Sequence, residues 1–135
     1  VCSSDLWIED SVEKNAESYL IGNTIKLLDK EIIVSFSEIQ QGHVGTVYQA
    51  CNFLYCGLSA KFKDPKVKGL EHKHHATYAH GMNTQQIKEK YGDNVYYVER
   101  PRKHRYIYFN AKTKKRKKKQ LSKLKYKVLE YPKKG

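Results

Sequence analysis

The fold is decided by the segment from Gly42 to Gly57, which reads Gly-His-Val-Gly-Thr-Val-Tyr-Gln-Ala-Cys-Asn-Phe-Leu-Tyr-Cys-Gly. It follows an apolar run over 32–36, which is typical of a strand buried on both faces of a sheet. Two glycines and His43 mark the junction after that strand, and we expect a helix over 44–55 that Gly57 ends. Polar and aromatic groups beyond the end of a buried strand are the usual setting of an α/β active site.

On both sides of this segment, the pattern predicts alternating strands and helices. We expect a short strand at 6–8, a helix over 16–29 with Asn15 as its N-cap, and a strand over 58–62. Helical crossovers between successive strands imply parallel pairing.

The second half is more polar. We expect a long loop over 63–81, a helix over 85–91 capped by Thr84 and closed by Gly92, and two strands at 95–98 and 106–109, antiparallel to one another. A charge run over 112–119 has no periodicity, and 121–131 reads as a final edge strand. The predicted class is α/β of the α+β kind: a mixed twisted sheet with flanking helices and a basic β-hairpin as the C-terminal tail.

The positive charge is concentrated at one end of the chain. The 135 residues carry a net charge of +12, yet residues 1–100 hold eleven basic and thirteen acidic side chains, whereas residues 101–135 hold fifteen basic and one acidic. Such asymmetry indicates a nucleic acid or another polyanion as partner. Neither a membrane-spanning stretch nor a signal peptide is visible, so we expect a cytoplasmic protein, and three cysteines suggest no disulfide framework.

The N-terminal residues suggest how the chain is organised. Residues 1–6 read like the translated end of a sequencing adapter, and we expect a non-native leader. Residues 7–110 then form one domain whose first strands are missing, and residues 111–135 form the basic tail and final strand.

Four groups of residues are candidates for chemistry. Ser35, Glu38 and His43 surround the end of the strand over 32–36, where a carboxylate and an imidazole act as an acid/base pair or stand as ordinary loop side chains. Tyr48 begins an i, i+4, i+7 stripe that continues with Asn52 and Tyr55, and this stripe lines either the core or a cleft.

The other two groups bind anions. Lys14, Asn15 and Ser18 open the first helix, where backbone N–H groups can bind phosphate. Without a glycine-rich loop, these residues alone favour an ordinary capped helix. Basic residues interleaved with aromatic ones suit DNA phosphates and bases; they are Arg102, Lys103, Arg105, Lys114, Lys115, Arg116 and Lys117. The irregular spacing of His72, His74, His75 and His80 does not match a structural zinc site, so we assign no metal ligands and leave a metal requirement open.

Several segments, taken in order, resemble the Mom-type DNA-modification proteins of bacteriophages, a branch of the GNAT acyltransferase-like fold. The similar segments are Leu6 to Asp10, Lys14 to Gly22, Ile33 to Glu38, His43 to Tyr55, Tyr91-Gly92, Lys103 to Tyr106 and Tyr131 to Lys133. The family usually has Ser-Tyr-Ala-Asp where this chain has Ser35-Phe36-Ser37-Glu38. The carboxylate is therefore kept one methylene further out, and the tyrosine hydroxyl is lost.

The resemblance implies an enzyme, a transferase that adds a carbamoylmethyl-type group to the N6 amine of adenine in DNA and so protects phage DNA from host restriction. It implies an acyl-CoA-type donor whose pyrophosphate lies at Lys14 to Ser18, with the acceptor amine near Ser35. DNA is then the partner, and neither a membrane nor a protein partner is expected. Two alternatives stay open: an ordinary GNAT N-acyltransferase acting on a protein or small amine, and a non-enzymatic basic DNA-binding accessory protein.

Overall fold

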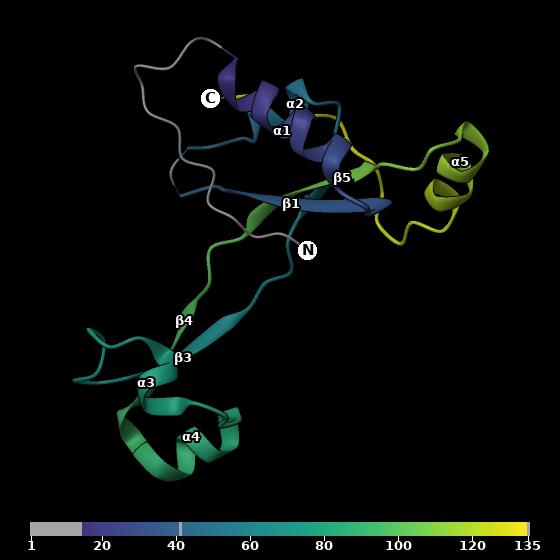
Figure 1. Cartoon of the computed structure of the whole chain (residues 1–135). Coiled ribbons are helices and arrows are strands. Elements are labelled where there is room, and N and C mark those ends of the chain that lie inside the picture. Colours follow the sequence, from purple (N-terminus) through teal and green to yellow (C-terminus); the bar gives the residue numbers. More distant parts are fainter. Residues whose placement is uncertain (1–14, 41, 135) are drawn as a thin grey trace. The chain divides into compact units, whose positions relative to one another are not determined.

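The structure is a computed structural model that describes residues 15–40 and 42–134 (Figure 1). The chain divides into two compact units. Unit 1 comprises the residues up to 59 together with those from 102 onward, and unit 2 comprises residues 60–101. The class is α+β, as the sequence predicts, and every ladder among the described residues is antiparallel. The predicted strand at 6–8 lies outside the described residues.

Unit 1 is built on a three-stranded sheet in the order β1-β5-β2. Its strands are β1 (Ile32–Glu38), β2 (Leu54–Leu58) and β5 (Lys103–Phe109). The expectation of parallel pairing is wrong, because β5 pairs antiparallel with both neighbours. β1 and β2 do run in the same direction, as a helical crossover requires, but β5 is inserted between them.

The two faces of this sheet have different cores, because successive side chains of β5 point to opposite faces. On one face, Tyr106 packs with residues of α1 (Ala16–Leu27), α2 (Thr46–Ala50) and the segment that follows α2. On the other, Ile107 and Phe109 pack with Cys56 and Leu124. β1 is therefore an edge strand, largely half-buried, and not a strand buried on both faces.

Two helix boundaries differ from those predicted. The helix expected over 44–55 ends at Ala50, because Asn52 adopts a left-handed conformation with φ 62° directly after the C-cap and turns the chain into β2. Tyr55 and Gly57 consequently lie in a strand and end no helix. The first helix is confirmed as α1, with Asn15 at the N-cap position, although the Asn15 side chain makes no cap hydrogen bond.

Unit 2 holds a two-stranded sheet and two helices. The first strand and the first helix lie where a long loop was expected over 63–81, and the helix expected over 85–91 is confirmed. β3 (Lys63–Val67) pairs with β4 (Val95–Glu99), and the helices are α3 (His75–Ala79) and α4 (Thr84–Tyr91), followed by the 3-10 turn η1 (Gly92–Asn94). Val67, Tyr78 and Ile87 form its core. Asn83, not Thr84, caps α4, through a reciprocal capping box with Gln86. The strand predicted over 95–98 is present but pairs with β3, not with β5.

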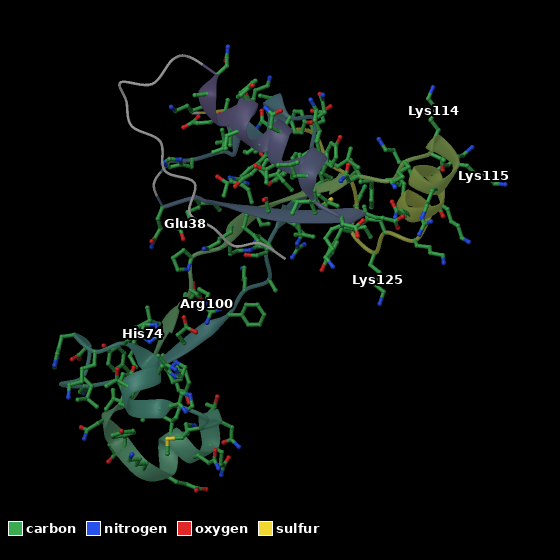
Figure 2. All side chains as sticks on the ribbon, in the orientation of Figure 1. Glu38, His74, Arg100, Lys114, Lys115 and Lys125 are labelled. Carbon is green, nitrogen blue, oxygen red and sulfur yellow. The ribbon has the colours of Figure 1, made fainter. Side chains whose placement is uncertain are left out.

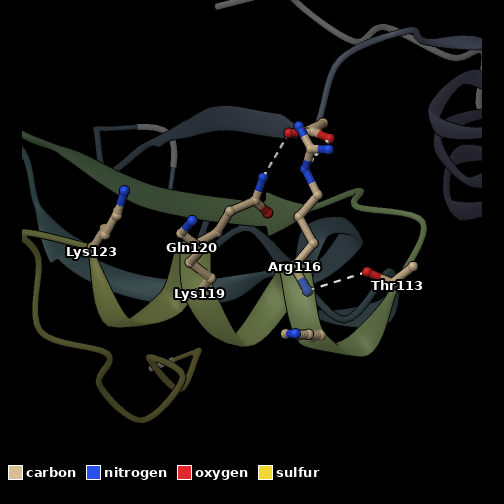
Figure 3. A pocket seen from close by; sticks show the side chains of 7 residues that line it. Thr113, Arg116, Lys119, Gln120 and Lys123 are labelled. Carbon is tan, nitrogen blue, oxygen red and sulfur yellow. Dashed lines mark hydrogen bonds and ion pairs between the residues drawn. The ribbon is translucent and has the colours of Figure 1, made fainter.

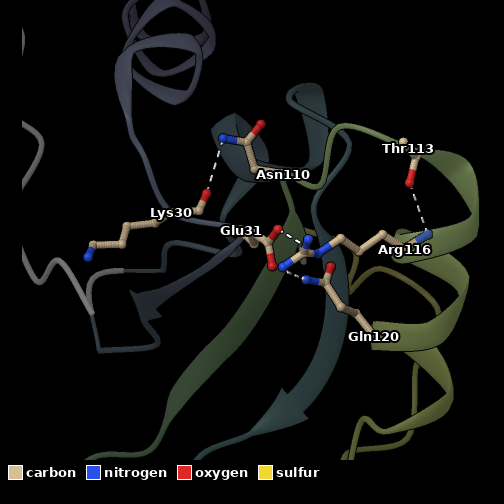
Figure 4. A network of polar contacts seen from close by, with 6 residues as sticks. All are labelled: Lys30, Glu31, Asn110, Thr113, Arg116 and Gln120. Atoms are coloured by element: carbon tan, nitrogen blue, oxygen red, sulfur yellow. Dashed lines mark hydrogen bonds and ion pairs between the residues drawn. The ribbon is translucent and has the colours of Figure 1, made fainter.

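The basic tail contains a helix, α5 (Lys114–Ser122), in place of the predicted β-hairpin. Thr113 caps it by accepting a hydrogen bond from the Arg116 amide at 3.3 Å. Glu31, just before β1, accepts from Arg116 at 2.6 Å and from Gln120 at 3.0 Å, which fixes α5 to unit 1 (Figure 4). The final strand expected over 121–131 is reduced to one bridge between Leu129 and Tyr55.

We expect Gly45→Ala to destabilise unit 1 by about 3 kcal/mol, because two penalties combine. Gly45 has φ 77°, and a Cβ there would overlap the ring of the fully buried Tyr106. Gly42→Ala is the matched control: its φ is 69°, but a Cβ would meet nothing within 4 Å, so only the conformational cost of about 1 kcal/mol applies. Chemical denaturation of both variants measures the difference, and equal losses would contradict this account.

Candidate functional site

A buried tyrosine joins the segment after β1 to the C-terminal tail. The Tyr106 hydroxyl donates to the Val44 carbonyl. The Gln49 amide donates to the Tyr106 hydroxyl at 3.0 Å and to the Pro132 carbonyl at 3.3 Å. Burial raises the pKa of Tyr106, against a smaller lowering by the Gln49 hydrogen bond, so the hydroxyl stays protonated and keeps donating. This network holds the loop at 42–45 in one position at the end of β1.

A second polar pair lies on the same side of the sheet. The Tyr55 hydroxyl and His104 Nδ1 are 2.8 Å apart. Burial raises the pKa of Tyr55, partly offset by the charge of Arg102, and burial lowers the pKa of His104. Both groups are therefore held neutral near pH 7. In the sequence, only the alternation of His104 with Tyr106 in a strand signals that His104 faces inward.

The predicted catalytic carboxylate has a cationic partner. Glu38 accepts from Lys103 Nζ at 2.7 Å, because the two residues are opposite each other in the β1–β5 register. The hydrogen bond to Lys103 and its charge lower the pKa of Glu38, and the charge of His43 adds a smaller lowering. His43 is thus within electrostatic reach of Glu38, and its carbonyl accepts from the Ser37 hydroxyl at 3.2 Å. The structure brings Glu38, Lys103 and His43 together at one end of β1.

The other two predicted catalytic residues lie elsewhere. Ser35 is opposite Tyr106 and so belongs to the face of β1 that does not carry Glu38. Tyr48 packs in the core on the Ser35 face, with ring centroids 5.4 Å from Phe53 and 5.5 Å from Tyr106. Of the two readings of the tyrosine stripe, the core reading applies to Tyr48.

The predicted donor-binding residues are described only in part. Lys14 lies outside the described residues. The Ser18 hydroxyl donates to the Asn15 carbonyl at 3.0 Å, so this hydroxyl has a partner within the helix. Phosphate binding at this helix N-terminus stays a prediction.

The predicted DNA-binding residues fall into two groups. Arg102 donates to the Ser59 carbonyl at 2.7 Å, and the Arg105 guanidinium lies 3.9 Å from the centroid of the half-exposed Tyr126 ring. In contrast, Lys114 of α5 points away from the sheet of unit 1, as Figure 2 shows, whereas Arg116 of the same helix reaches back to Glu31. An open cavity of about 550 Å³ lies along α5, lined by Lys115, Arg116, Lys119, Lys123, Thr113, Gln120 and Glu31 (Figure 3).

Within residues 15–40 and 42–134, no three His, Cys, Asp or Glu side chains gather closely enough to hold a metal ion. His74 of the histidine-rich segment instead caps α3, accepting from the Ala76 amide at 3.2 Å. No helix in the described part of the chain is both long and apolar enough to span a membrane.

We expect His104 to contribute a pH-dependent part of the stability. Because its pKa is lower in the folded protein, the unfolded chain takes up a proton first, and stability falls as the pH drops below about 6.5. His104→Gln keeps a polar group but cannot titrate there. The stability advantage of wild type over this variant should therefore shrink between about pH 7.5 and 5.5, as measured by urea unfolding. An advantage that is constant with pH would show that His104 titrates alike in both states.

Comparison with known proteins identifies the family of this chain. No curated protein matches the chain. The family described as the Mom protein family matches residues 4–133, which is nearly the whole chain and includes β1, β5, α5 and the Glu38–Lys103 pair. The chain therefore belongs to the Mom protein family, a family of phage DNA-modification proteins.

Proposed function

We propose that this protein is a transferase that adds a carbamoylmethyl-type group to the N6 amine of adenine in DNA and so protects phage DNA from restriction. The observation that carries the proposal is the family match over residues 4–133. The GNAT relationship and an acyl-CoA-type donor belong to the same proposal.

The electrostatics of the chain support DNA as the substrate. Six of the nine residues of α5 are Lys or Arg. Among the described ion pairs, only Arg116 of this helix has a carboxylate partner. Unneutralised cations on one exposed helix attract a phosphate backbone and make its binding depend on salt.

The group at the end of β1 suits work on an exocyclic amine. The N6 amine of adenine is a weak nucleophile because its lone pair is delocalised into the ring, so its attack needs a base or a polarising contact. Glu38, held anionic by Lys103, accepts a hydrogen bond from the amine and orients it. His43 is the neighbouring group that takes the proton. In a duplex the adenine must first be flipped out of the stack to reach them.

The donor is assigned to the start of α1, where a helix N-terminus favours phosphate groups. The Asn15 side-chain amide does not cap this helix, so its N–H groups suit a phosphate oxygen. When bound, the donor would supply the group that is transferred: as the bond to N6 forms, the bond between that group and its carrier breaks, and the carrier leaves with the electron pair. The protein residues at α1 hold and orient its phosphates.

The test is nucleoside mass spectrometry of DNA from cells that express the protein. Wild type should produce modified adenine. His43→Ala should lower its level by about 100-fold or more, while DNA binding in vitro stays near normal, because the proposed role of His43 is in the transition state and not in docking.

His80→Ala is the matched control, because His80 is an exposed histidine of unit 2 with no role in the proposal. Wild-type levels of modified adenine in His43→Ala would remove His43 from the mechanism. DNA binding without modified adenine in wild type would favour the accessory-protein alternative.

A further inference from the structure

Only some of the lysines of α5 line the cavity beside this helix. Lys115, Lys119 and Lys123 are spaced at i, i+4 and i+8, so they form one stripe about 12 Å long. Lys114 and Lys118 lie about 100° further round the helix and do not line the cavity. The helix therefore has one lysine pair that faces the cavity and an equally spaced pair that does not.

The acidic residue that lines this cavity is already engaged. One oxygen of Glu31 accepts from Arg116 and the other from Gln120 (Figure 4). None of the described ion pairs gives the three stripe lysines a carboxylate partner. Three cations along one wall of a cavity repel each other, and an anion relieves that repulsion.

Gln120 helps to hold α5 beside the cavity. Its Nε2 donates to Glu31 at 3.0 Å, so exchanging the two amide atoms would place oxygen against oxygen. Its Oε1 is buried and, within the described part of the chain, accepts no hydrogen bond. Because this oxygen has almost no accessible surface, the positions open to a ligand are the lysines of the stripe.

We propose that this cavity binds the backbone of one DNA strand, with successive phosphates on Lys115, Lys119 and Lys123. The proposal rests on the DNA-modifying function and names its docking site. A strand is favoured over a free nucleotide because the stripe is longer than one phosphate group and the basic sequence continues with Lys125 and Lys127. Glu31 is a positioning residue, since it fixes α5 through Arg116 and Gln120.

The experiment compares two double variants with the same change in charge. Lys115→Gln/Lys119→Gln removes two cavity lysines, and Lys114→Gln/Lys118→Gln removes two from outside it. Glutamine keeps the helix propensity close to that of lysine. The affinity for a fluorescent DNA oligonucleotide is measured by anisotropy over a range of salt concentrations, and circular dichroism confirms that α5 stays folded.

We expect the cavity variant to lose more than about tenfold in affinity near 0.1 M salt and its log–log salt slope to shrink by about 2. The outer variant should show a clearly smaller loss, because it removes only general attraction. Equal losses in both variants would overturn the cavity as the docking site while leaving DNA binding, and so the proposed function, intact.

Two further arms separate the remaining outcomes. If free adenine nucleotide displaces the oligonucleotide from wild type but not from the cavity variant, the cavity is a nucleotide site and the strand assignment is wrong. Normal oligonucleotide affinity and salt dependence in the cavity variant would also overturn it. Modified adenine in cells, measured separately by mass spectrometry, reports on the proposed function whichever of these results is obtained.

Discussion

The burial of Tyr106 is the constraint on which unit 1 depends. This side chain is fully buried in the centre of the middle strand, yet it carries a hydroxyl that must be satisfied. The Val44 carbonyl and the Gln49 amide satisfy it, which requires the loop after β1 to close over the ring. That closure is possible only because Gly45 has no side chain. The position of the loop, and of His43 within it, follows from this one contact.

The local elements were more predictable than their pairing. The apolar spacing within 16–29 and the β-branched run at 32–36 each depend on neighbours in sequence, so α1 and β1 could be read directly. The insertion of β5 between β1 and β2 depends on contacts across about 70 residues, which no local pattern encodes. The helix α5 was also missed, because its lysines were interpreted only as a run of charge. Lysine is a good helix former, and here Thr113 caps the helix and Glu31 pairs with Arg116.

In the candidate site, too, features set by neighbours in sequence could be predicted, and features set by strand pairing could not. The separation of Ser35 from Glu38 was readable, because positions three apart in a strand lie on opposite faces. The Glu38–Lys103 pair was not, since it arises from the β1–β5 register. Sequence alone identified the carboxylate and the lysine but assigned them to different roles. Their contact favours the anionic form of Glu38. In the proposed function this suits binding an amine better than removing its proton, and that second task falls to His43.

The strand β1 separates the residues proposed to bind DNA from the residues proposed to act on the amine. Glu31, which fixes α5, stands just before the strand, and Glu38 ends it, so seven residues of extended chain separate them. At about 3.3 Å per residue the separation is about 23 Å. In the proposed function the flipped adenine and the phosphates that hold the DNA are therefore different parts of the substrate, and loss of α5 contacts weakens binding without altering the geometry around the amine.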